Sequence, residues 1–135
     1  MTHSQPVLAI DNLSLEFPAY KSSVKALNGV SLHVNPGEIV GVVGESGSGK
    51  SVTAMLSMRL LPERSYRITS GSLSMLNRDM LSAPEKDLLK IRGRDAAMIF
   101  QEPMTALNPT RRIGRQMLDV IIHHQKISAA AAHAK

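Results

Sequence analysis

The 135-residue sequence contains no cysteine and no tryptophan, and only 3% of its residues are aromatic. The absence of cysteine excludes disulfides and thiolate metal sites. Two tyrosines and two phenylalanines are too few for a surface that stacks on nucleic-acid bases. No apolar run approaches the ~18 residues that a membrane-spanning helix needs, and the start, MTHSQPVLAI, lacks the basic region of a signal peptide. We therefore expect one domain in the cytoplasm.

Charge is distributed unevenly along the chain, whose formal net charge is +5. Residues 1–58 carry three Lys/Arg and four Asp/Glu, whereas residues 59–135 carry thirteen and seven. Such a basic excess can indicate a nucleic-acid partner or an acidic membrane surface. The arginines are scattered rather than aligned on one periodic stripe, which favours an ordinary solvated surface. We expect no nucleic-acid partner.

The apolar pattern predicts an α/β fold. Residues 7–17 and 24–34 alternate in part, as strands with one buried face do, and 71–77 is a shorter candidate strand. Two runs, 39–43 and 96–100, are continuously apolar, which is typical of parallel strands buried on both faces. Helical spacing or capping signals indicate helices over 50–61, 82–93 and 113–127, and Ser128 is a candidate cap for a further helix.

The segment GESGSGKS, residues 44–51, matches the phosphate-binding pattern G-x-x-x-x-G-K-[ST] between a predicted strand and a predicted helix. Glycines allow successive N–H groups to face one concave site, and the helix N-terminus adds a positive dipole. Lys50 would reach the β and γ phosphates, and the Ser51 hydroxyl would ligate Mg²⁺. The alternative is a glycine-rich turn capped by serine. The predicted nucleotide-binding residues here are Gly44, Glu45, Ser46, Gly47, Ser48, Gly49, Lys50, Ser51 and Val52.

A glutamine follows the second continuously apolar run, in the segment IFQEPMTALNP. An amide at the carboxyl end of a core strand can lie beside a metal ion and a γ phosphate. From the residues alone, Gln101 is either such a ligand or a cap at the end of the strand. The phosphate loop occurs in many nucleotide enzymes, including P-loop kinases, so it does not by itself define the reaction.

Taken together, GESGSGKS and AMIFQEPMTALNP resemble the ATP-binding subunits of ABC transporters, in the branch that serves oligopeptide, dipeptide and nickel importers. The stretch LNGVSLHVNPGEIVGVVGESGSGKSVTAM is similar to that branch nearly throughout. The resemblance implies a P-loop NTPase fold, the ABC-type nucleotide-binding domain, with an N-terminal antiparallel β part on a RecA-like core. It assigns residues 1–101 to the β part and core, and 102–135 to the start of the helical subdomain.

The resemblance also implies roles for single residues and partners. Lys50 and Gln101 would act in catalysis with MgATP, and Gln101 would join Ser51 at Mg²⁺. An aromatic residue stacks on adenine in this family; Tyr20 is the candidate, though it could equally be a surface tyrosine with Val24 packing on the base. The partners would be a second ABC ATPase subunit, in a homo- or heterodimer, and permease subunits contacting 102–109. In that segment, Met104 and Leu107 could instead pack inward.

Three family features are missing from the sequence: the LSGGQ-type signature, the strand ending in Asp-Glu (Walker B) and the switch histidine. The segment VLAID resembles that strand, but it precedes the phosphate loop, so we interpret Asp11 as a turn residue. His123 and His124 are adjacent on a predicted helix and are poor joint metal ligands. The sequence therefore predicts an N-terminal fragment, peripheral on the cytoplasmic face of the inner membrane, that binds nucleotide but hydrolyses it poorly. The alternative is a truncated, non-catalytic nucleotide-binding module.

Overall fold

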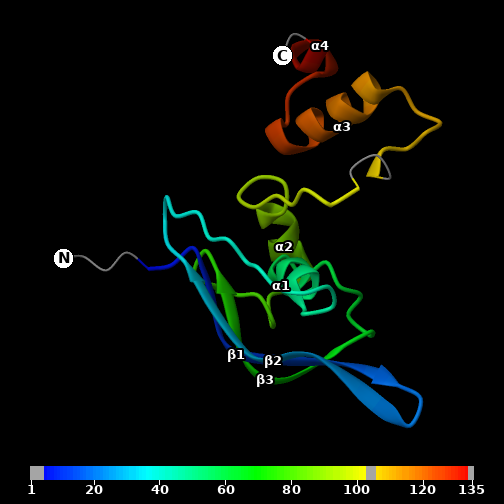
Figure 1. Ribbon diagram of the computed structural model, residues 1–135. Coiled ribbons are helices and arrows are strands. Elements are labelled where there is room, and N and C mark those ends of the chain that lie inside the picture. The colour runs from blue at the N-terminus through cyan, green and yellow to red at the C-terminus, as the bar shows by residue number, and fades with distance from the viewer. Residues whose placement is uncertain (1–4, 103–105, 134–135) are drawn as a thin grey trace. The chain divides into compact units, whose positions relative to one another are not determined.

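A computed structural model describes residues 5–102 and 106–133 of the chain (Figure 1). It forms two compact units, Met1–Leu89 and Lys90–Lys135. The first contains most of the secondary structure, and α2 reaches the second, which also holds two further helices. The elements are β1 (Leu8–Ala19), β2 (Ser22–Val34), α1 (Lys50–Ser57), β3 (Arg67–Met75), β4 (Arg78–Asp79), α2 (Glu85–Ile91), α3 (Ile113–Gln125) and α4 (Ala129–His133).

The first unit is built on an antiparallel sheet with the strand order β2-β1-β3-β4. The predicted strands at 7–17, 24–34 and 71–77 are confirmed as β1, β2 and β3. Alternating apolar residues give the sheet one buried face, and α1 packs against β2 and β3 with Leu56 fully buried. The most deeply buried strand residues are Ile10, Leu13, Leu15, Leu27 and Leu73. This packing fixes the start of α1, and with it Lys50, against the sheet.

A β-bulge interrupts the middle strand. Asp11 pairs with Ser72 and Ser14 pairs with Ser70, so Asn12 and Leu13 together lie opposite the single residue Gly71. Side-chain hydroxyls satisfy the bulged backbone: the Asn12 N–H donates to Ser31 Oγ at 2.9 Å, and Ser70 Oγ donates to the Asn12 carbonyl at 3.3 Å. The bulge explains why the apolar spacing changes from alternation to a step of three residues at this point.

The two continuously apolar runs do not form the predicted buried strands. Residues 39–43 and 97–100 lie outside any strand ladder among the described residues, although Ala96 makes an isolated bridge to Arg92. Ile39 is 98% exposed, Val43 is 97% exposed and Ile99 is 92% exposed. The prediction of burial was wrong for this chain because a parallel strand is buried only when neighbouring strands and helices cover it, and the described residues supply none.

A polar cluster joins the end of α1 to the segment before α2. Arg59 follows the helix in a left-handed conformation, with φ at 53°. Its guanidinium, largely buried, donates to the Ala83 carbonyl and to Glu63 Oε1. Nearby, Asp79 Oδ2 accepts from the Ser82 hydroxyl at 2.7 Å, and Asp79 Oδ1 accepts from the Leu81 N–H at 2.9 Å. The helix α1 ends at Ser57, and these contacts follow it, whereas the sequence predicts a helix as far as residue 61.

Asp79 gives the fold an acid-sensitive contact. The Ser82 hydroxyl lowers the pKa of Asp79 below its ordinary value of 3.8, backbone N–H groups and Arg59 act in the same direction, and burial opposes them. Because folding lowers the pKa of Asp79, its ionised carboxylate stabilises the fold at pH values above 3.8. That stabilisation is lost as the pH falls through the pKa that Asp79 has in the folded state. We expect Asp79→Asn to lower the free energy of unfolding by less than about 1 kcal/mol at pH 7, because the site is exposed.

Urea unfolding of both proteins between pH 7 and pH 3 measures this effect. The difference between wild type and Asp79→Asn should be largest above pH 5 and shrink toward pH 3. A difference that does not change with pH would contradict the assignment.

Candidate functional site

The phosphate-binding pattern forms a closed loop around its own lysine at the start of α1. Lys50 Nζ donates to the carbonyls of Gly44 at 2.7 Å and Glu45 at 2.6 Å, and to Ser48 Oγ at 3.2 Å. The Ser48 N–H closes the turn by donating to the Glu45 carbonyl at 3.2 Å. The ammonium group is therefore held at the centre of the loop. An anion bound there would meet a positive charge that is already in position.

Gly49 fixes the loop against the sheet. It has a φ of 89°, and a Cβ at this position would lie 2.7 Å from the Ala26 carbonyl oxygen and 2.8 Å from Leu27 Cδ2 on β2. Only glycine fits both the left-handed backbone and this close approach. The Gly49 carbonyl accepts hydrogen bonds from the Thr53 N–H at 2.8 Å and the Thr53 hydroxyl at 3.0 Å. The loop and the first turn of α1 are thus joined to β2.

The first turn of α1 offers unpaired backbone donors. The N–H groups of Lys50, Ser51 and Val52 have no intrahelical carbonyl to bond, because a helix leaves its first N–H groups free. No acidic residue lies in this first turn, so no neighbouring carboxylate in the turn competes for the helix dipole. Ser51 is exposed at the same end of the helix. These donors, the Lys50 ammonium and the Ser51 hydroxyl fit the phosphates and Mg²⁺ of a nucleotide.

Three predicted residues, Tyr20, Val24 and Gln101, are described outside this loop. Tyr20 is 90% exposed in the turn between β1 and β2, and the Lys21 ammonium lies 5.4 Å from its ring centroid. Figure 1 shows this turn at the end of the hairpin, apart from α1. Val24, on β2, is 58% exposed. Gln101 is exposed in the unit Lys90–Lys135. Roles for Tyr20, Val24 and Gln101 at the nucleotide stay predictions.

The segment predicted to contact a permease is described only in part. Met104 lies outside the described residues, and Leu107 is 37% exposed. Gln116 of α3 organises the end of the segment: its Oε1 accepts from the Asn108 N–H at 2.9 Å, and its Nε2 donates to the Asn108 carbonyl at 3.0 Å. No signal in the sequence pointed to Gln116, because its partner Asn108 lies eight residues away along the chain.

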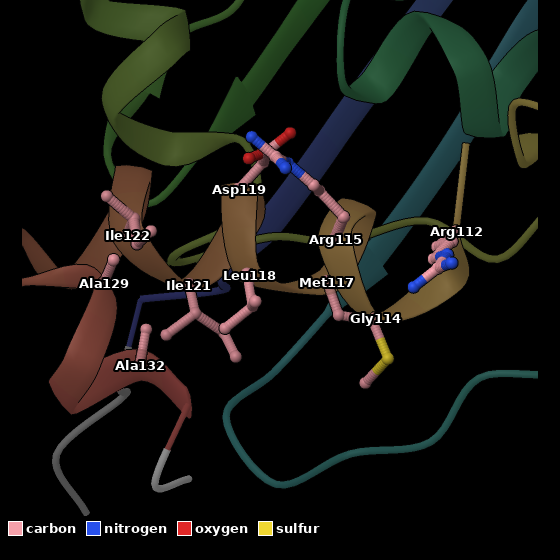
Figure 2. A pocket seen from close by; sticks show the side chains of 10 residues that line it. All are labelled: Arg112, Gly114, Arg115, Met117, Leu118, Asp119, Ile121, Ile122, Ala129 and Ala132. Carbon is pink, nitrogen blue, oxygen red and sulfur yellow. The ribbon is translucent and has the colours of Figure 1, made fainter.

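A cavity of about 790 Å³ lies between α3 and α4, within the second unit (Figure 2). Arg112 lies at one end of it, and Ala129 and Ala132 of α4 lie at the other. Its lining residues are Arg112, Gly114, Arg115, Met117, Leu118, Asp119, Ile121, Ile122, Ala129 and Ala132. The lining is mainly apolar, with three charged residues among it, Arg112, Arg115 and Asp119.

The other residues considered in the sequence are two histidines and Asp11. The rings of His123 and His124 meet edge to face at 5.1 Å, and among the described residues no three His, Asp or Glu side chains are placed to hold a metal ion. Asp11 lies within β1 rather than in the predicted turn, and its Oδ1 is 2.9 Å from His33 Nε2. The bulge explains this misplacement, because it interrupts the alternation without ending the strand.

Comparison with known proteins identifies the family. A family model described as ABC transporter matches residues 27–135, which include the whole phosphate loop and Gln101. The chain belongs to the ABC transporter family. It is 64% identical over 132 residues to the probable D,D-dipeptide transport ATP-binding protein DdpD of Escherichia coli (strain K12), and covers 40% of that protein. It is 44% identical over 128 residues to the dipeptide transport ATP-binding protein DppD of Bacillus subtilis (strain 168), covering 38%. These matches take in 98% and 95% of this chain.

The fold of this ABC-family chain is confirmed by a solved structure. The dimeric post-hydrolysis state of the ATP-binding cassette MJ0796, bound to ADP and Pi, superposes with a TM-score of 0.74 at 22% identity. The match covers 93% of this chain and 52% of MJ0796, so the predicted P-loop NTPase class is correct and the chain spans part of such a domain. None of the helices in residues 5–102 and 106–133 has the length and apolarity that a membrane crossing requires.

Proposed function

We propose that this ABC-family chain supplies the MgATP-binding part of an ATPase that energises import of peptides or a similar small solute. The observation that carries the proposal is the Lys50 ammonium, held by the carbonyls of Gly44 and Glu45 at the N-terminus of α1. The relatives support the cargo class, since their names refer to dipeptide and D,D-dipeptide transport. Nucleotide phosphates are bound by backbone N–H groups, a lysine and a helix N-terminus, and Lys50 and the first turn of α1 supply the last two.

Binding would use the loop backbone and a small set of side chains. The N–H groups of the loop from Gly44 to Gly49 and of the first turn of α1 would surround the β phosphate, and Lys50 would reach the β and γ phosphates. Ser51 would ligate Mg²⁺, joined by Gln101. The metal ion would neutralise charge on the β and γ phosphates. Tyr20 is the proposed stacking residue for adenine, and Val24 is the alternative.

Hydrolysis is proposed to be weak in this chain. Transfer of a phosphoryl group to water requires a carboxylate for the metal ion and a group that positions the water. The sequence has no apolar strand ending in Asp-Glu after the loop. Glu45, the acidic residue inside the loop, contributes its carbonyl to Lys50. A second candidate function is therefore a nucleotide-binding module that does not turn over.

The partners are proposed from the family. A second ABC ATPase subunit would pair with this one, as the dimeric state named for MJ0796 suggests. Permease subunits would contact residues 102–109, and the protein would then lie on the cytoplasmic face of the inner membrane. No nucleic acid is proposed as a partner.

Calorimetric titration of the purified chain with ATP and Mg²⁺ tests the proposal, with phosphate release measured on the same sample. Saturable binding with little release is the expected result. Binding with turnover equal to that of full-length DdpD would refute the weak-hydrolysis proposal, and absence of nucleotide binding would refute the function itself.

Ser51 gives a sharper test of the metal site. We expect Ser51→Ala to weaken MgATP binding about tenfold, the effect of losing one charge-assisted ligand. Binding of ATP in EDTA should not change, because the serine hydroxyl is proposed to act through the metal ion alone. Equal weakening in both conditions would show that Ser51 contacts phosphate or maintains the loop instead.

A further inference from the structure

A groove within the second unit leaves space that no side chain fills. It lies between α3 and α4, and its volume is about 790 Å³ (Figure 2). On the α4 side it is lined by Ala129 and Ala132. Protein interiors are normally filled to high density, and the methyl groups of these alanines leave open the space that a larger side chain would occupy. A volume of this size is typical of a site for a small molecule.

The connection between the two helices holds both walls of the groove. Lys126 ends α3 in a left-handed conformation, with φ at 51°, and its N–H donates to the Ile122 carbonyl at 3.0 Å. Ser128 then caps α4: its Oγ accepts from the Ala131 N–H at 3.3 Å, and its carbonyl accepts from the Ala132 N–H at 3.0 Å. Ala132 is buried as a result. Hydrogen-bonded backbone therefore fixes the turn from one wall into the other.

The lining of the groove favours a flexible aliphatic chain. Figure 2 shows the side chains of Met117, Leu118 and Ile121 on the same side of α3. None of the lining residues is aromatic, so a planar ring would find no stacking surface. The walls are helices, whose peptide groups bond to one another, so an added β-strand would find no partners. Methionine and branched aliphatic side chains instead adapt to an alkyl chain.

One end of the groove carries a positive charge. Arg112 lies at that end, at the start of α3, whereas the side chains of Arg115 and Asp119 point to the other side of the helix (Figure 2). Asp119 is the acidic residue of the lining, and its Oδ2 already accepts from the Arg111 guanidinium at 2.5 Å. No carboxylate of residues 5–102 and 106–133 pairs with Arg112. An anion at this end would therefore meet a cation whose charge is not already compensated.

We propose that this groove binds a fatty acid, with the aliphatic chain between α3 and α4 and the carboxylate at Arg112. Each methylene buried in the groove strengthens binding about fourfold, and the charge at one end fixes the orientation of the ligand. The ligand is a soluble fatty acid rather than a bilayer, because acidic bilayers are bound by clusters of about four to eight basic residues, and the groove has Arg112 and Arg115 alone. Fatty-acid binding here does not require nucleotide binding.

Calorimetric titration of the purified chain with decanoate tests the proposal. Saturable binding at one site is expected, and hexanoate, which has four fewer methylenes, should bind at least tenfold more weakly. Arg112→Gln should weaken decanoate binding about tenfold but leave decanol binding within twofold, because decanol has the same chain length and no charge. The matched control is Arg78→Gln, which removes an exposed arginine on β4 and should change neither affinity.

A second variant tests the position of the aliphatic chain. Ala129 lines the groove and is exposed, so Ala129→Trp should fill the groove without disturbing the fold, as circular dichroism would verify. Decanoate and decanol should both lose at least tenfold in affinity. Ligand binding that this variant leaves unchanged would place the ligand elsewhere on the chain.

Three further results would overturn the proposal. The first is the absence of saturable decanoate binding, including the case in which the chain sediments with phosphatidylglycerol vesicles instead, which would identify a bilayer as the partner. The second is an equal loss of decanoate and decanol binding in Arg112→Gln, which would mean that Arg112 maintains the groove rather than binding the carboxylate. The third is a dimer that decanoate does not dissociate and that excludes it, which would identify a second copy as the occupant. MgATP affinity is measured on the same samples, so failure of this proposal and failure of the nucleotide site are observed separately.

Discussion

Replacing Lys50 with alanine is expected to lower the affinity for MgATP about 100-fold. A charge-assisted hydrogen bond contributes about 1.5–3 kcal/mol, and each 1.4 kcal/mol corresponds to a tenfold change in affinity. In this structure the ammonium group is already placed inside the loop, within 2.6–2.7 Å of two carbonyl oxygens. Its removal would take away the only side-chain positive charge that the loop carries. Calorimetric titration with MgATP measures the loss.

The same lysine also holds the loop together. The loss of a phosphate contact must therefore be separated from a change in the structure of the loop. The matched control is Lys86→Ala, which removes an exposed lysine on α2 and should leave MgATP affinity within twofold of wild type. Lys50→Arg retains the charge and its donors while altering their geometry, and should recover part of the affinity. Urea unfolding reports whether the alanine variant has lost the fold. If Lys50→Ala stays folded and binds MgATP as wild type does, the site assignment is wrong.

The shape of the loop was predictable from the sequence because a turn and a helix start depend on neighbouring residues, whereas phosphate binding by the loop stays a prediction. The eight residues 44–51 specify a turn that leads into α1 with Lys50 as its first residue, and the structure has both the turn and the helix start. What the motif could not predict is the state of Lys50 without nucleotide, which depends on the carbonyl directions of Gly44 and Glu45. The contact between Gly49 and β2 was equally hidden, because it joins residues more than twenty positions apart.

The strands show the same distinction between local and distant effects. β1 and β2 form a hairpin, so the apolar pattern and a short turn were sufficient to predict them. The segment 39–43 has an equally clear pattern but no neighbour among the described residues, and it remains exposed. A pattern records the environment in which a strand is stable, whereas burial requires that the partner be present. The bulge at Asn12 was predictable only in part, because the break in apolar alternation after Ile10 indicates an irregularity but not its pairing with Gly71.

Gly71 is the position where we expect the largest loss of stability. It has a φ of 87°, and a Cβ there would lie 2.5 Å from the Asp11 carbonyl oxygen and closer still to the Asn12 carbonyl. Alanine would therefore add left-handed strain of about 1–2 kcal/mol to an overpacking cost of about 1–3 kcal/mol. The clash is with backbone rather than with a flexible side chain, so relaxation would have to separate β3 from the bulge of β1.

We expect Gly71→Ala to lower the free energy of unfolding by about 3 kcal/mol or more, enough to unfold a marginally stable chain at room temperature. Gly29→Ala is the matched control: its φ is 64°, but an added Cβ would meet nothing within 4 Å. It should lose only the strain, about 1 kcal/mol. Urea denaturation followed by circular dichroism compares the two. Equal losses would mean that the close approach at the bulge does not exist in solution. A loss at Gly71 at least twice that at Gly29 would confirm that the bulge fixes the pairing of β1 with β3, and so the sheet on which α1 and Lys50 are positioned.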